Sequence, residues 1–200
     1  AAAADALVFN SQYNRETFID GACAFIESMP DHHPSIRERF EQRSLVLPVP
    51  LEDACFVATR EEPRIQRLVW NHRWEWDKAP ERFFSALRIL KELGIKPRVG
   101  LVGQSFRQVP PSIREGIEEF EEQLDFVGFQ PLEIYREILK TSSHVVSTAL
   151  HEFQGLAVAE ACAAGCVPIV PDRLSYVEMF PEASRYGSFP DDADREALAL

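Results

Sequence analysis

The feature that most constrains the fold is a regular alternation of short apolar runs with longer amphipathic runs, from about residue 66 to residue 180. The short runs are continuously apolar, which is typical of strands buried on both faces of a parallel sheet. The longer runs repeat apolar residues every three or four positions, which is typical of helices that cover such a sheet. The alternation therefore predicts an α/β domain with a parallel sheet and helices on both faces. The expected strands are 68–70, 99–103, 124–128, 144–148 and 167–170, and the expected helices are 79–94, 112–123, 131–140, a run that ends at 165 and a short one at 175–179.

Residues 1–60 follow a different pattern. A strand at 6–11 and a helix at 13–28 are predicted, while 44–51 is expected to be extended and stiffened by prolines. Two strands and one helix cannot enclose a core of their own, so we expect the tail of a truncated N-terminal domain here. The predicted division is the end of that domain plus a linker at 1–60, a domain at 61–190 and a C-terminal tail at 191–200.

Charge and hydropathy exclude several classes of protein. The 21 Lys and Arg residues against 32 Asp and Glu residues give a net charge of −11. Such a field repels polyanions, so a stand-alone nucleic-acid binder is not expected, although Arg37, Arg39 and Arg43 form a local basic cluster. No apolar run reaches the roughly 18 residues of a membrane span, and the alanine-rich start lacks the basic region of a secretory signal. We therefore expect a cytoplasmic protein without a membrane partner.

The cysteines show no spacing typical of a metal site. Cys162 and Cys166 lie four residues apart in an alanine-rich run, where small apolar side chains are expected in a core. His32 and His33 are far away in the sequence and are expected in an exposed loop. We therefore expect free thiols in a reducing compartment and no bound metal. The four cysteines are Cys23, Cys55, Cys162 and Cys166.

The most informative motif is HEFQGLAVAEACAAGCVPIVP at 151–171. Glu152 follows a predicted strand and is expected at the carboxyl edge of the sheet, where open α/β sheets bind ligands. Gly155 permits a close backbone approach, and the N–H groups of the helix that follows it can bind an anion. Glu160 is a carboxylate in a run of small apolar residues, which is costly unless a partner satisfies it. This combination suits a sugar nucleotide, and the alternative is that Glu152 caps the helix while Glu160 is solvated.

A second motif, VWNHRWEWDKAPERF at 69–83, follows the first strand of the domain. Arg73 and Lys78 are expected in a strand-to-helix loop at the same carboxyl edge, where two cations can clamp a diphosphate. Asn71 and His72 crowd the same turn. In the alternative interpretation, the tryptophans pack the loop and the two cations pair with neighbouring acidic residues.

Glycines follow two further predicted strands at this edge. Gly103 stands beside Gln104, and Gly128 stands beside Phe129. Either glycine alone is weak evidence, because a glycine after a strand often only makes the turn. The chain contains no G-x-G-x-x-G, Walker A, G-x-S-x-G or H-E-x-x-H pattern, which disfavours several rival classes of enzyme.

Together these motifs resemble family 4 of the retaining glycosyltransferases, which have the GT-B fold. The resemblance covers about 66–180 and rests on Arg73, Lys78, the run Glu152-Phe153-Gln154-Gly155-Leu156, Glu160 and Gly165. More narrowly, NSQYNRETF, WNHRWEWDKAPERFF and STALHEFQGLAVAEA are similar to the tRNA-queuosine α-mannosyltransferase group, also described as glycosyltransferase-like domain proteins. This narrower likeness covers nearly the whole chain. It implies that 61–190 is the C-terminal Rossmann-like domain of a GT-B enzyme, which follows the tail of an N-terminal Rossmann-like domain.

The resemblance also implies an activity, namely transfer of mannose from GDP-mannose to queuosine in tRNA with no cofactor and no required metal. Arg73 and Lys78 are then expected to hold the donor diphosphate, and Glu152 to contact hydroxyls of the transferred sugar. Those three residues form the expected catalytic set, while Glu160 is expected to bind the ribose. The expected donor-binding set is Asn71, His72, Arg73, Lys78, Gly103, Gly128, Phe153, Gly155, Leu156 and Glu160.

Two departures qualify what the resemblance implies. The acceptor site of such enzymes belongs to the N-terminal domain, so tRNA is expected to bind only through the half that this chain lacks. The family motif often reads Glu-Gly-Phe-Gly-Leu, whereas Phe153 and Gln154 stand here in place of the Gly-Phe pair, which predicts a specialised sugar pocket. Three alternatives stay open: another nucleotide sugar with a lipid, glycan or small-molecule acceptor, a GT-B nucleotide-sugar epimerase, and a non-catalytic nucleotide-sugar-binding module.

Overall fold

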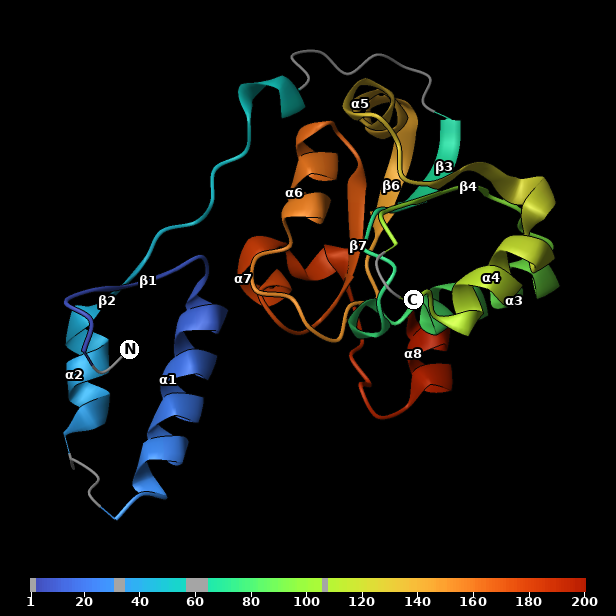
Figure 1. The fold of residues 1–200 in the computed structure, drawn as a ribbon. Coiled ribbons are helices and arrows are strands. Elements are labelled where there is room, and N and C mark those ends of the chain that lie inside the picture. The colour runs from blue at the N-terminus through green and yellow to red at the C-terminus, as the bar shows by residue number, and fades with distance from the viewer. Residues whose placement is uncertain (1–2, 31–34, 57–64, 106–107) are drawn as a thin grey trace.

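The computed structural model describes residues 3–30, 35–56, 65–105 and 108–200. These residues form two separate β-sheets that an extended segment connects (Figure 1). We call the six-stranded sheet with its helices the larger unit, and the two-stranded sheet with its helices the smaller unit. The predicted loop with His32 and His33, and the predicted boundary at 60–61, lie outside the described residues.

The strands of the larger sheet run parallel in the order β5-β4-β3-β6-β7-β8. The chain enters at β3, moves outward through β4 and β5, and then returns to β6 on the other side of β3. Open α/β sheets bind ligands at such a reversal of strand order. The strands are β3 (Ile65–Trp70), β4 (Arg98–Val102), β5 (Leu124–Gly128), β6 (Ser142–Val146), β7 (Val167–Pro171) and β8 (Arg185–Tyr186).

The helices of the larger unit begin at residues suited to initiation. Pro80 and Pro111 occupy the first turns of α3 and α4, where the missing N–H of proline costs nothing. The apolar residues of α3 recur at helical spacing, so Phe83, Phe84 and Leu87 are all buried on one face. The helices are α3 (Pro80–Glu92), α4 (Pro111–Glu119), α5 (Leu132–Thr141), α6 (Leu156–Ala163), α7 (Tyr176–Met179) and α8 (Ala193–Ala199), with short 3-10 turns η2 (Trp76–Lys78), η3 (Glu121–Gln123) and η4 (Glu182–Ser184).

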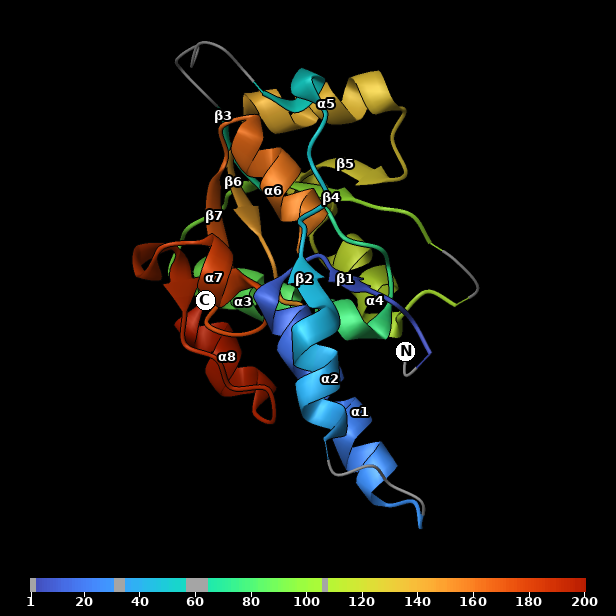
Figure 2. The same cartoon turned by 90° about the vertical axis from the view of Figure 1, so that its left-hand side faces the viewer.

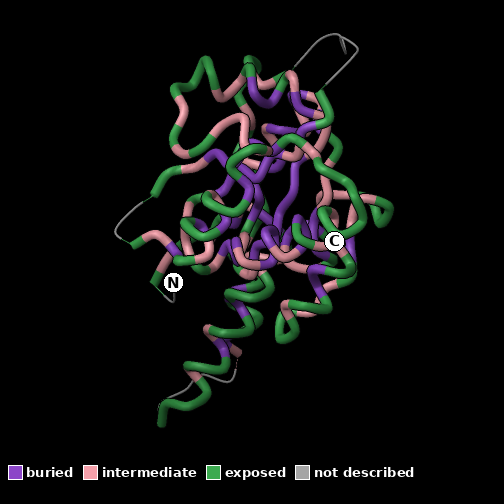
Figure 3. The backbone as a smooth tube through the Cα atoms, turned by 90° about the vertical axis from the view of Figure 1, so that its right-hand side faces the viewer, coloured by how far each residue is buried: buried purple, intermediate pink, exposed green. Residues whose placement is uncertain are grey.

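Neighbouring residues of the central strands face two different hydrophobic cores, as the two-residue period of a strand requires. Val69 and Val145 belong to a core with α5 and α6, whereas Trp70 and Val146 belong to a core with α3 and α4. Figure 3 shows the buried backbone concentrated in the interior of this unit. Helices therefore cover both faces of the sheet, which confirms the predicted α/β class.

Helix α8 closes the larger unit against α3 through a buried ion cluster. Glu196 is 1% exposed, and its carboxylate accepts from Arg173 Nη1 at 2.5 Å and lies 2.8 Å from Arg82 Nη1. Burial tends to raise the pKa of this carboxyl, but the hydrogen bonds from Arg173 and Arg82 lower the pKa below its usual value. Arg173 also donates from Nε to the carbonyl oxygen of Ala149 at 3.0 Å. The cluster thus ties α8 to the loop that follows β6.

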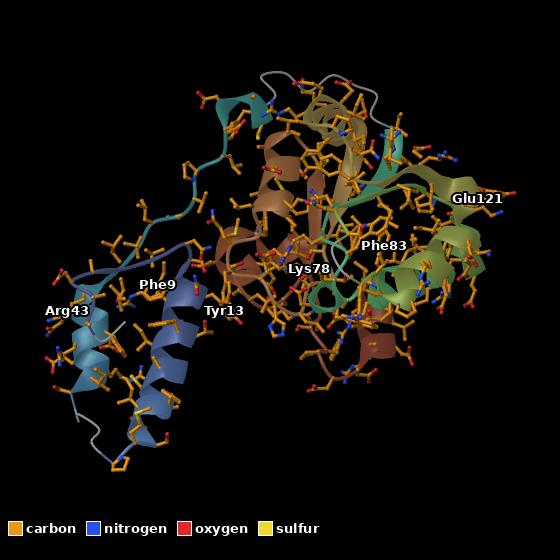
Figure 4. The ribbon with its side chains drawn as sticks, in the orientation of Figure 1. Phe9, Tyr13, Arg43, Lys78, Phe83 and Glu121 are labelled. Atoms are coloured by element: carbon orange, nitrogen blue, oxygen red, sulfur yellow. The ribbon has the colours of Figure 1, made fainter. Side chains whose placement is uncertain are left out.

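The smaller unit has its own narrow core. It pairs β1 (Leu7–Phe9) with β2 (Ser44–Val46) in parallel and packs α1 (Gln12–Glu27) against α2 (Ile36–Arg43). Phe9 lies between α1 and α2 in the view of Figure 4. The buried residues of this core are Ile19, Cys23, Ile36 and Phe40.

A connecting segment, residues 47–52, runs from β2 to the larger unit and ends at η1 (Asp53–Cys55). Figures 1 and 2 both show this segment passing to a position beside α5 and α6. At its end, Arg136 Nη2 on α5 donates to Glu52 Oε2 at 2.6 Å. The segment is therefore in contact with the larger unit before the chain enters β3.

A second contact between the two units involves the start of α1. The carboxylate of Glu178 on α7 accepts from the backbone N–H of Gln12 at 3.0 Å and from that of Tyr13 at 3.1 Å. Both N–H groups belong to the first turn of α1, where a negative charge is favourable.

The five predicted strands of the larger sheet are confirmed as β3 to β7, whereas α2, β8 and α8 were not predicted. In α2, only Ile36 and Phe40 are buried in an otherwise charged run, so the apolar period is too sparse to recognise. In β8, two residues are too few to show any period. The residues at 191–200, expected to form a tail, contain α8.

Candidate functional site

Three loops meet at the carboxyl ends of the parallel strands, and backbone hydrogen bonds hold them together. Trp74 N–H, after β3, donates to the carbonyl oxygen of Gln104, after β4, at 3.0 Å. Gly103 N–H, also after β4, donates to the carbonyl oxygen of Gly128, at the end of β5, at 3.2 Å. The structure thereby brings residues from separate motifs of the sequence to one edge.

Gly103 marks the closest approach between two of these loops. A Cβ atom at this position would lie 1.8 Å from the carbonyl oxygen of His72 and 3.1 Å from Trp74 Cδ1. Any other residue would therefore push the loop after β3 away from its place. Gly128 has a φ of +83°, which favours glycine for conformational reasons.

Lys78 is buried among the loops at this edge, with 6% of its side chain exposed. Its Nζ donates to the carbonyl oxygen of His151 at 2.6 Å, and lies 3.3 Å from Glu152 Oε2 and 3.2 Å from Asp77 Oδ2. The backbone supports this arrangement, because Leu150 N–H donates to the carbonyl oxygen of Asp77 at 2.8 Å. In the view of Figure 4, Lys78 lies near the middle of the molecule. The result is an ammonium group fixed in place by the loop after β6.

Glu152 is held by Lys78 and by its own backbone neighbours. Its Oε1 accepts from Phe153 N–H at 3.1 Å and more weakly from Gln154 N–H at 3.5 Å. Burial tends to raise the pKa of this carboxyl, but the positive charge of Lys78 and the hydrogen bonds outweigh burial and lower the pKa below its usual value. Glu152 is therefore a carboxylate at neutral pH and can accept hydrogen bonds from hydroxyl groups.

Arg73 lies at the rim, unlike Lys78. Its side chain is 54% exposed, and Nη1 lies 3.4 Å from Glu75 Oε2. Arg73 pairs with Glu75, and Lys78 pairs with Asp77 and Glu152, so the two cations have no common partner. Pairing with acidic neighbours is what the alternative interpretation of this motif predicts. Trp74 packs against the core with α3, whereas Trp76 is 62% exposed. As a rim side chain, Arg73 can turn toward an anion without breaking a buried contact.

His72 and Asn71 are buried where β3 ends. The His72 ring packs edge-on to Trp70, with ring centroids 5.1 Å apart. Burial lowers the pKa of His72 to about 4, and the positive charge of Lys78 acts in the same direction, so the imidazole is neutral at pH 7. Among the described residues, His72 Nε2 and Asn71 Oδ1 have no hydrogen-bond partner. Both residues thus place at this edge of the sheet a buried polar atom that can still accept or donate a hydrogen bond.

Tyr135 on α5 links two of the predicted site residues, although the sequence motifs did not include it. Its hydroxyl donates to Glu160 Oε2 at 3.0 Å and accepts from Asn71 Nδ2 at 3.0 Å. Asn71 Nδ2 also donates to the carbonyl oxygen of Ala157 at 2.7 Å. Burial and the adjacent Glu160 raise the pKa of the phenol, which keeps the hydroxyl protonated. This chain of bonds supplies the partner that a carboxylate on α6 was expected to need.

Helix α6 begins at the same edge because Gly155 turns the chain with a φ of +76°. A Cβ atom on Gly155 would lie 2.7 Å from Tyr176 Cε1, so packing also requires glycine. No side chain in the described part of the chain caps α6. Phe153 and Leu156, on either side of Gly155, are both exposed. The start of α6 thus combines uncapped N–H groups with two exposed apolar side chains.

Two hollows lie beside this edge and share Leu132 and Tyr135 in their walls. The smaller hollow, of about 60 Å³, contains Glu160 between α5 and η1. The larger one, of about 300 Å³, is open to solvent and draws its walls from three of the motifs. Its lining includes Asn71, His72, Arg73, Gly103, Gln104 and Phe129.

The described ranges contain no group of three or more His, Cys, Asp or Glu side chains placed to hold a metal ion. In the same ranges the four cysteines are not joined in disulfides, and Cys23 and Cys166 are buried as expected for small apolar residues. Across the same ranges, no helix is both long and apolar enough to cross a membrane.

Comparison with known families divides the chain into two parts. Residues 61–199 match the family model described as glycosyl transferases group 1, and residues 1–51 match the one described as tRNA-queuosine alpha-mannosyltransferase N-terminal. The tRNA-queuosine alpha-mannosyltransferase of Drosophila melanogaster is 34% identical over 197 residues, which cover 93% of this chain and 52% of that protein. The chain therefore spans about half the length of this curated relative. These matches confirm the resemblance that the motifs indicated.

Solved glycosyltransferase structures share the fold. The pneumococcal O-GlcNAc transferase GtfA, in complex with UDP and GlcNAc, has a TM-score of 0.68 at 15% identity, and the match covers 98% of this chain and 36% of GtfA. HepE of Anabaena, in complex with UDP and glucose, has a TM-score of 0.70 at 15% identity, and the match covers 98% of this chain and 52% of HepE. At this identity the likeness concerns the fold alone, and it confirms the predicted GT-B class.

Proposed function

Because the chain belongs to the glycosyl transferases group 1 family, we propose that it forms the donor-binding part of a retaining mannosyltransferase. The proposed reaction transfers mannose from GDP-mannose to queuosine in tRNA. The observation that carries this proposal is the meeting of Lys78, Glu152 and the uncapped start of α6 at one edge of the sheet. The 34% identity to the tRNA-queuosine alpha-mannosyltransferase of Drosophila melanogaster supports mannose as the sugar and queuosine as the acceptor.

In this proposal the donor lies along the carboxyl edge, with its diphosphate near Lys78 and Arg73. Glu152 accepts from hydroxyls of the transferred sugar, and exposed Phe153 and Leu156 border the sugar. The N–H groups that follow Gly155 approach the sugar and phosphate. Glu160, which Tyr135 holds at 3.0 Å, accepts from the ribose hydroxyls. The remaining proposed donor contacts are Asn71, His72, Gly103 and Gly128.

The chemistry needs positive charge where the leaving group develops negative charge. When the bond between the anomeric carbon and the diphosphate oxygen breaks, both electrons go to the diphosphate. Lys78 is already fixed by His151, Glu152 and Asp77, so its charge requires little reorganisation at that moment. We propose that Lys78 and Arg73 together neutralise the diphosphate without a metal ion.

The acceptor is proposed to bind mainly outside this chain. The net charge of −11 is unfavourable for tRNA, and the exposed arginines of α2 are partly neutralised, since Arg37 Nη2 lies 2.7 Å from Asp20 Oδ1. We propose that 1–60 belongs to an N-terminal domain with its linker and that 61–190 binds the donor. The tRNA then approaches through the N-terminal half of the full-length protein.

A thermal-shift panel tests the donor assignment, with GDP, GDP-mannose, UDP, UDP-glucose and NADH as ligands. A ligand at about 100 times its dissociation constant stabilises the folded state by roughly 2.7 kcal/mol. We expect stabilisation by GDP and GDP-mannose alone, and its loss in Glu160→Ala. Glu133→Ala, on the exposed side of α5, is the matched control. A preference for UDP would contradict the GDP-mannose assignment, and no response in the full-length protein would contradict a nucleotide-sugar site.

Turnover by the full-length protein tests the catalytic assignment. Removal of a cation that stabilises the leaving group typically costs about 3 kcal/mol of transition-state stabilisation, so Lys78→Ala and Arg73→Ala are each expected to lower kcat roughly a hundredfold. The measurement is transfer of labelled mannose to queuosine-containing tRNA. Lys96→Ala, an exposed lysine before β4, should leave the rate unchanged. Wild-type turnover in Lys78→Ala would rule out the proposed role.

A further inference from the structure

Gln154 makes a pair of hydrogen bonds that the catalytic proposal does not use. Its Oε1 accepts from the backbone N–H of Val49 at 2.9 Å, and its Nε2 donates to the carbonyl oxygen of Val49 at 2.9 Å. The side-chain amide therefore bonds to both backbone groups of one residue, much as a neighbouring strand would. Gln154 is 8% exposed, so its amide is largely removed from solvent.

Val49 lies in the connecting segment, between Pro48 and Pro50. Because proline has no N–H, Val49 carries the one backbone donor of this tripeptide. Leu47, the first residue of the connecting segment, still bonds to the smaller unit, since its N–H donates to the carbonyl oxygen of Phe9 at 2.8 Å. Gln154 thus holds the connecting segment close to the point where it leaves the smaller unit.

The other neighbours of Gln154 belong to the candidate site. Glu152 Oε1 accepts from Gln154 N–H at 3.5 Å, and Gly155 is the residue from which α6 begins. A movement of the connecting segment would pull the amide of Gln154 and displace the loop on which Glu152 lies. That displacement would change the position of the Glu152 carboxylate relative to Lys78.

We propose that Gln154 is a positioning residue that couples the connecting segment to the loop of Glu152. A change in the position of the smaller unit would thereby shift the Glu152 carboxylate on the sugar side of the donor site. The proposal rests on the proposed function in that it takes Glu152 to contact the sugar. It accounts for Gln154 in a motif whose other polar residue, Glu152, is assigned to the donor.

Amide hydrogen exchange on the full-length protein tests the coupling without any nucleotide. Val49→Pro removes the N–H that Gln154 accepts and suits the proline-flanked segment. Val49→Pro removes one of the two bonds and leaves Gln154 Oε1 without its donor, so exchange at 153–157 is expected to accelerate roughly tenfold. Gln154→Met removes both bonds, so exchange at Val49 itself is expected to accelerate to a similar extent. Val49→Leu is the matched control, because it changes only a half-exposed side chain and keeps both backbone groups.

Calorimetric titration with GDP and GDP-mannose separates a positioning role from a purely structural one. If the bonds between Gln154 and Val49 hold the loop of Glu152 in the conformation that binds the sugar, both variants reduce the fraction of molecules in that conformation. The affinity for GDP-mannose is then expected to fall about tenfold, and the affinity for GDP to fall less. The double variant Gln154→Met with Val49→Pro should be no weaker than the worse single variant, because both remove one interaction. Val49→Leu should bind as the wild type does.

The outcomes separate the two proposals. Unchanged exchange at 153–157 in Val49→Pro overturns the coupling, whatever the protein binds. Faster exchange with unaltered GDP-mannose affinity overturns the link to the donor site. A wild-type protein that binds neither GDP nor GDP-mannose overturns the proposed function, while the exchange result still decides the coupling. If Gln154→Met fails to fold, Val49→Pro provides both measurements from the exposed side of the contact.

Discussion

The two units of this molecule differ in how much apolar surface they enclose. The larger unit has two cores on opposite faces of its sheet, with residues such as Val69 and Trp70 at 0% exposure. The smaller unit has four buried apolar residues in its core and leaves Phe25 64% exposed and Val8 57% exposed. A unit with so little buried surface is marginal by itself. Its order in this structure therefore depends on its contacts with the larger unit as well as on its own core.

In the part of the chain that the structure describes, polar contacts link the larger unit to the smaller unit and to the connecting segment. The carboxylate of Glu178 meets the start of α1, Gln154 bonds to Val49, and Arg136 bonds to Glu52. Each lies at the edge of the larger unit that carries the candidate site or beside it. The comparison indicates a well-packed larger unit to which a less stable neighbour is attached near the candidate site.

The largest expected effect comes from truncating one buried phenylalanine in each unit. Phe83→Ala should lower the free energy of unfolding by about 4 kcal/mol, because it leaves a cavity in the core with α3. Phe40→Ala should leave the main urea transition almost unchanged and instead speed amide exchange in α1 and α2. Phe25→Ala, at an exposed site, is the control and should do neither. Equal shifts of the main transition in the first two variants would show that the units unfold together.

The next effect is acid sensitivity located in the larger unit. Burial lowers the pKa of His72 to about 4, from about 6.5 in the unfolded chain. The unfolded state therefore binds the proton first, so this contribution to stability is complete above pH 6.5 and is lost as the pH falls toward 4. Between pH 7 and pH 5 we expect a loss of about 2 kcal/mol from this group. Urea unfolding of the wild type and of His72→Phe at both values measures it, and equal pH dependence in the two proteins would contradict it.

A smaller effect concerns the bonds around Tyr135. Tyr135→Phe keeps the ring but removes the hydroxyl that Glu160 and Asn71 share. We expect nucleotide affinity to fall roughly fivefold, since one hydrogen bond contributes about 1 kcal/mol and Glu160 loses its orientation. Titration with GDP measures the change. Tyr13→Phe, in the first turn of α1, is the matched control, and equal affinities in all three proteins would exclude this role for Tyr135.

The smallest expected effect is at the junction of the units. Glu178→Gln removes a negative charge from the start of α1, where such charges contribute about 0.5 kcal/mol. Exchange at the amides of Gln12 and Tyr13 should speed up by about twofold. High salt should speed up exchange at these two amides in the wild type by a similar factor, because salt screens the charge of Glu178. The same salt should have little effect on the variant, which lacks this charge. Glu182→Gln, at an exposed residue of η4, should have no effect on these amides.

Most of the larger unit could be predicted because burial imposes a pattern on the sequence. Val69 and Trp70 occupy opposite faces of one strand, and both faces are covered, so the run is apolar throughout. The smaller unit buries less apolar surface, so its sequence shows a weaker apolar pattern. In α2, only Ile36 and Phe40 face a core, and a helix that buries so little leaves almost no period to read.

The site could be predicted only as far as its residues lie in local motifs. Glu152 and Lys78 were recognisable because each follows a strand, although their 3.3 Å pairing was not. Tyr135 was missed because its hydroxyl meets residues from β3 and α6, a contact that no local spacing encodes. A weak signal existed, since Tyr135 shares a helical face with buried Ile138 and Leu139 and carries a polar group that needs a partner there. Gln154 gave no signal beyond its departure from the family motif.

The ion cluster around Glu196 has a consequence for the order in which the molecule assembles during synthesis. Arg82 and Arg173 are synthesised before Glu196, whose carboxylate they share. Until Glu196 is made, each arginine lacks the partner that compensates its burial. Strands β3 to β8 also emerge before Glu196. Until that residue arrives, Arg173 lacks the anchor that aligns it with Ala149. The contact of Arg173 with the loop after β6 therefore gains its support from Glu196 only once α8 has been made, whereas the contacts of this loop with Asp77 and Lys78 do not depend on α8.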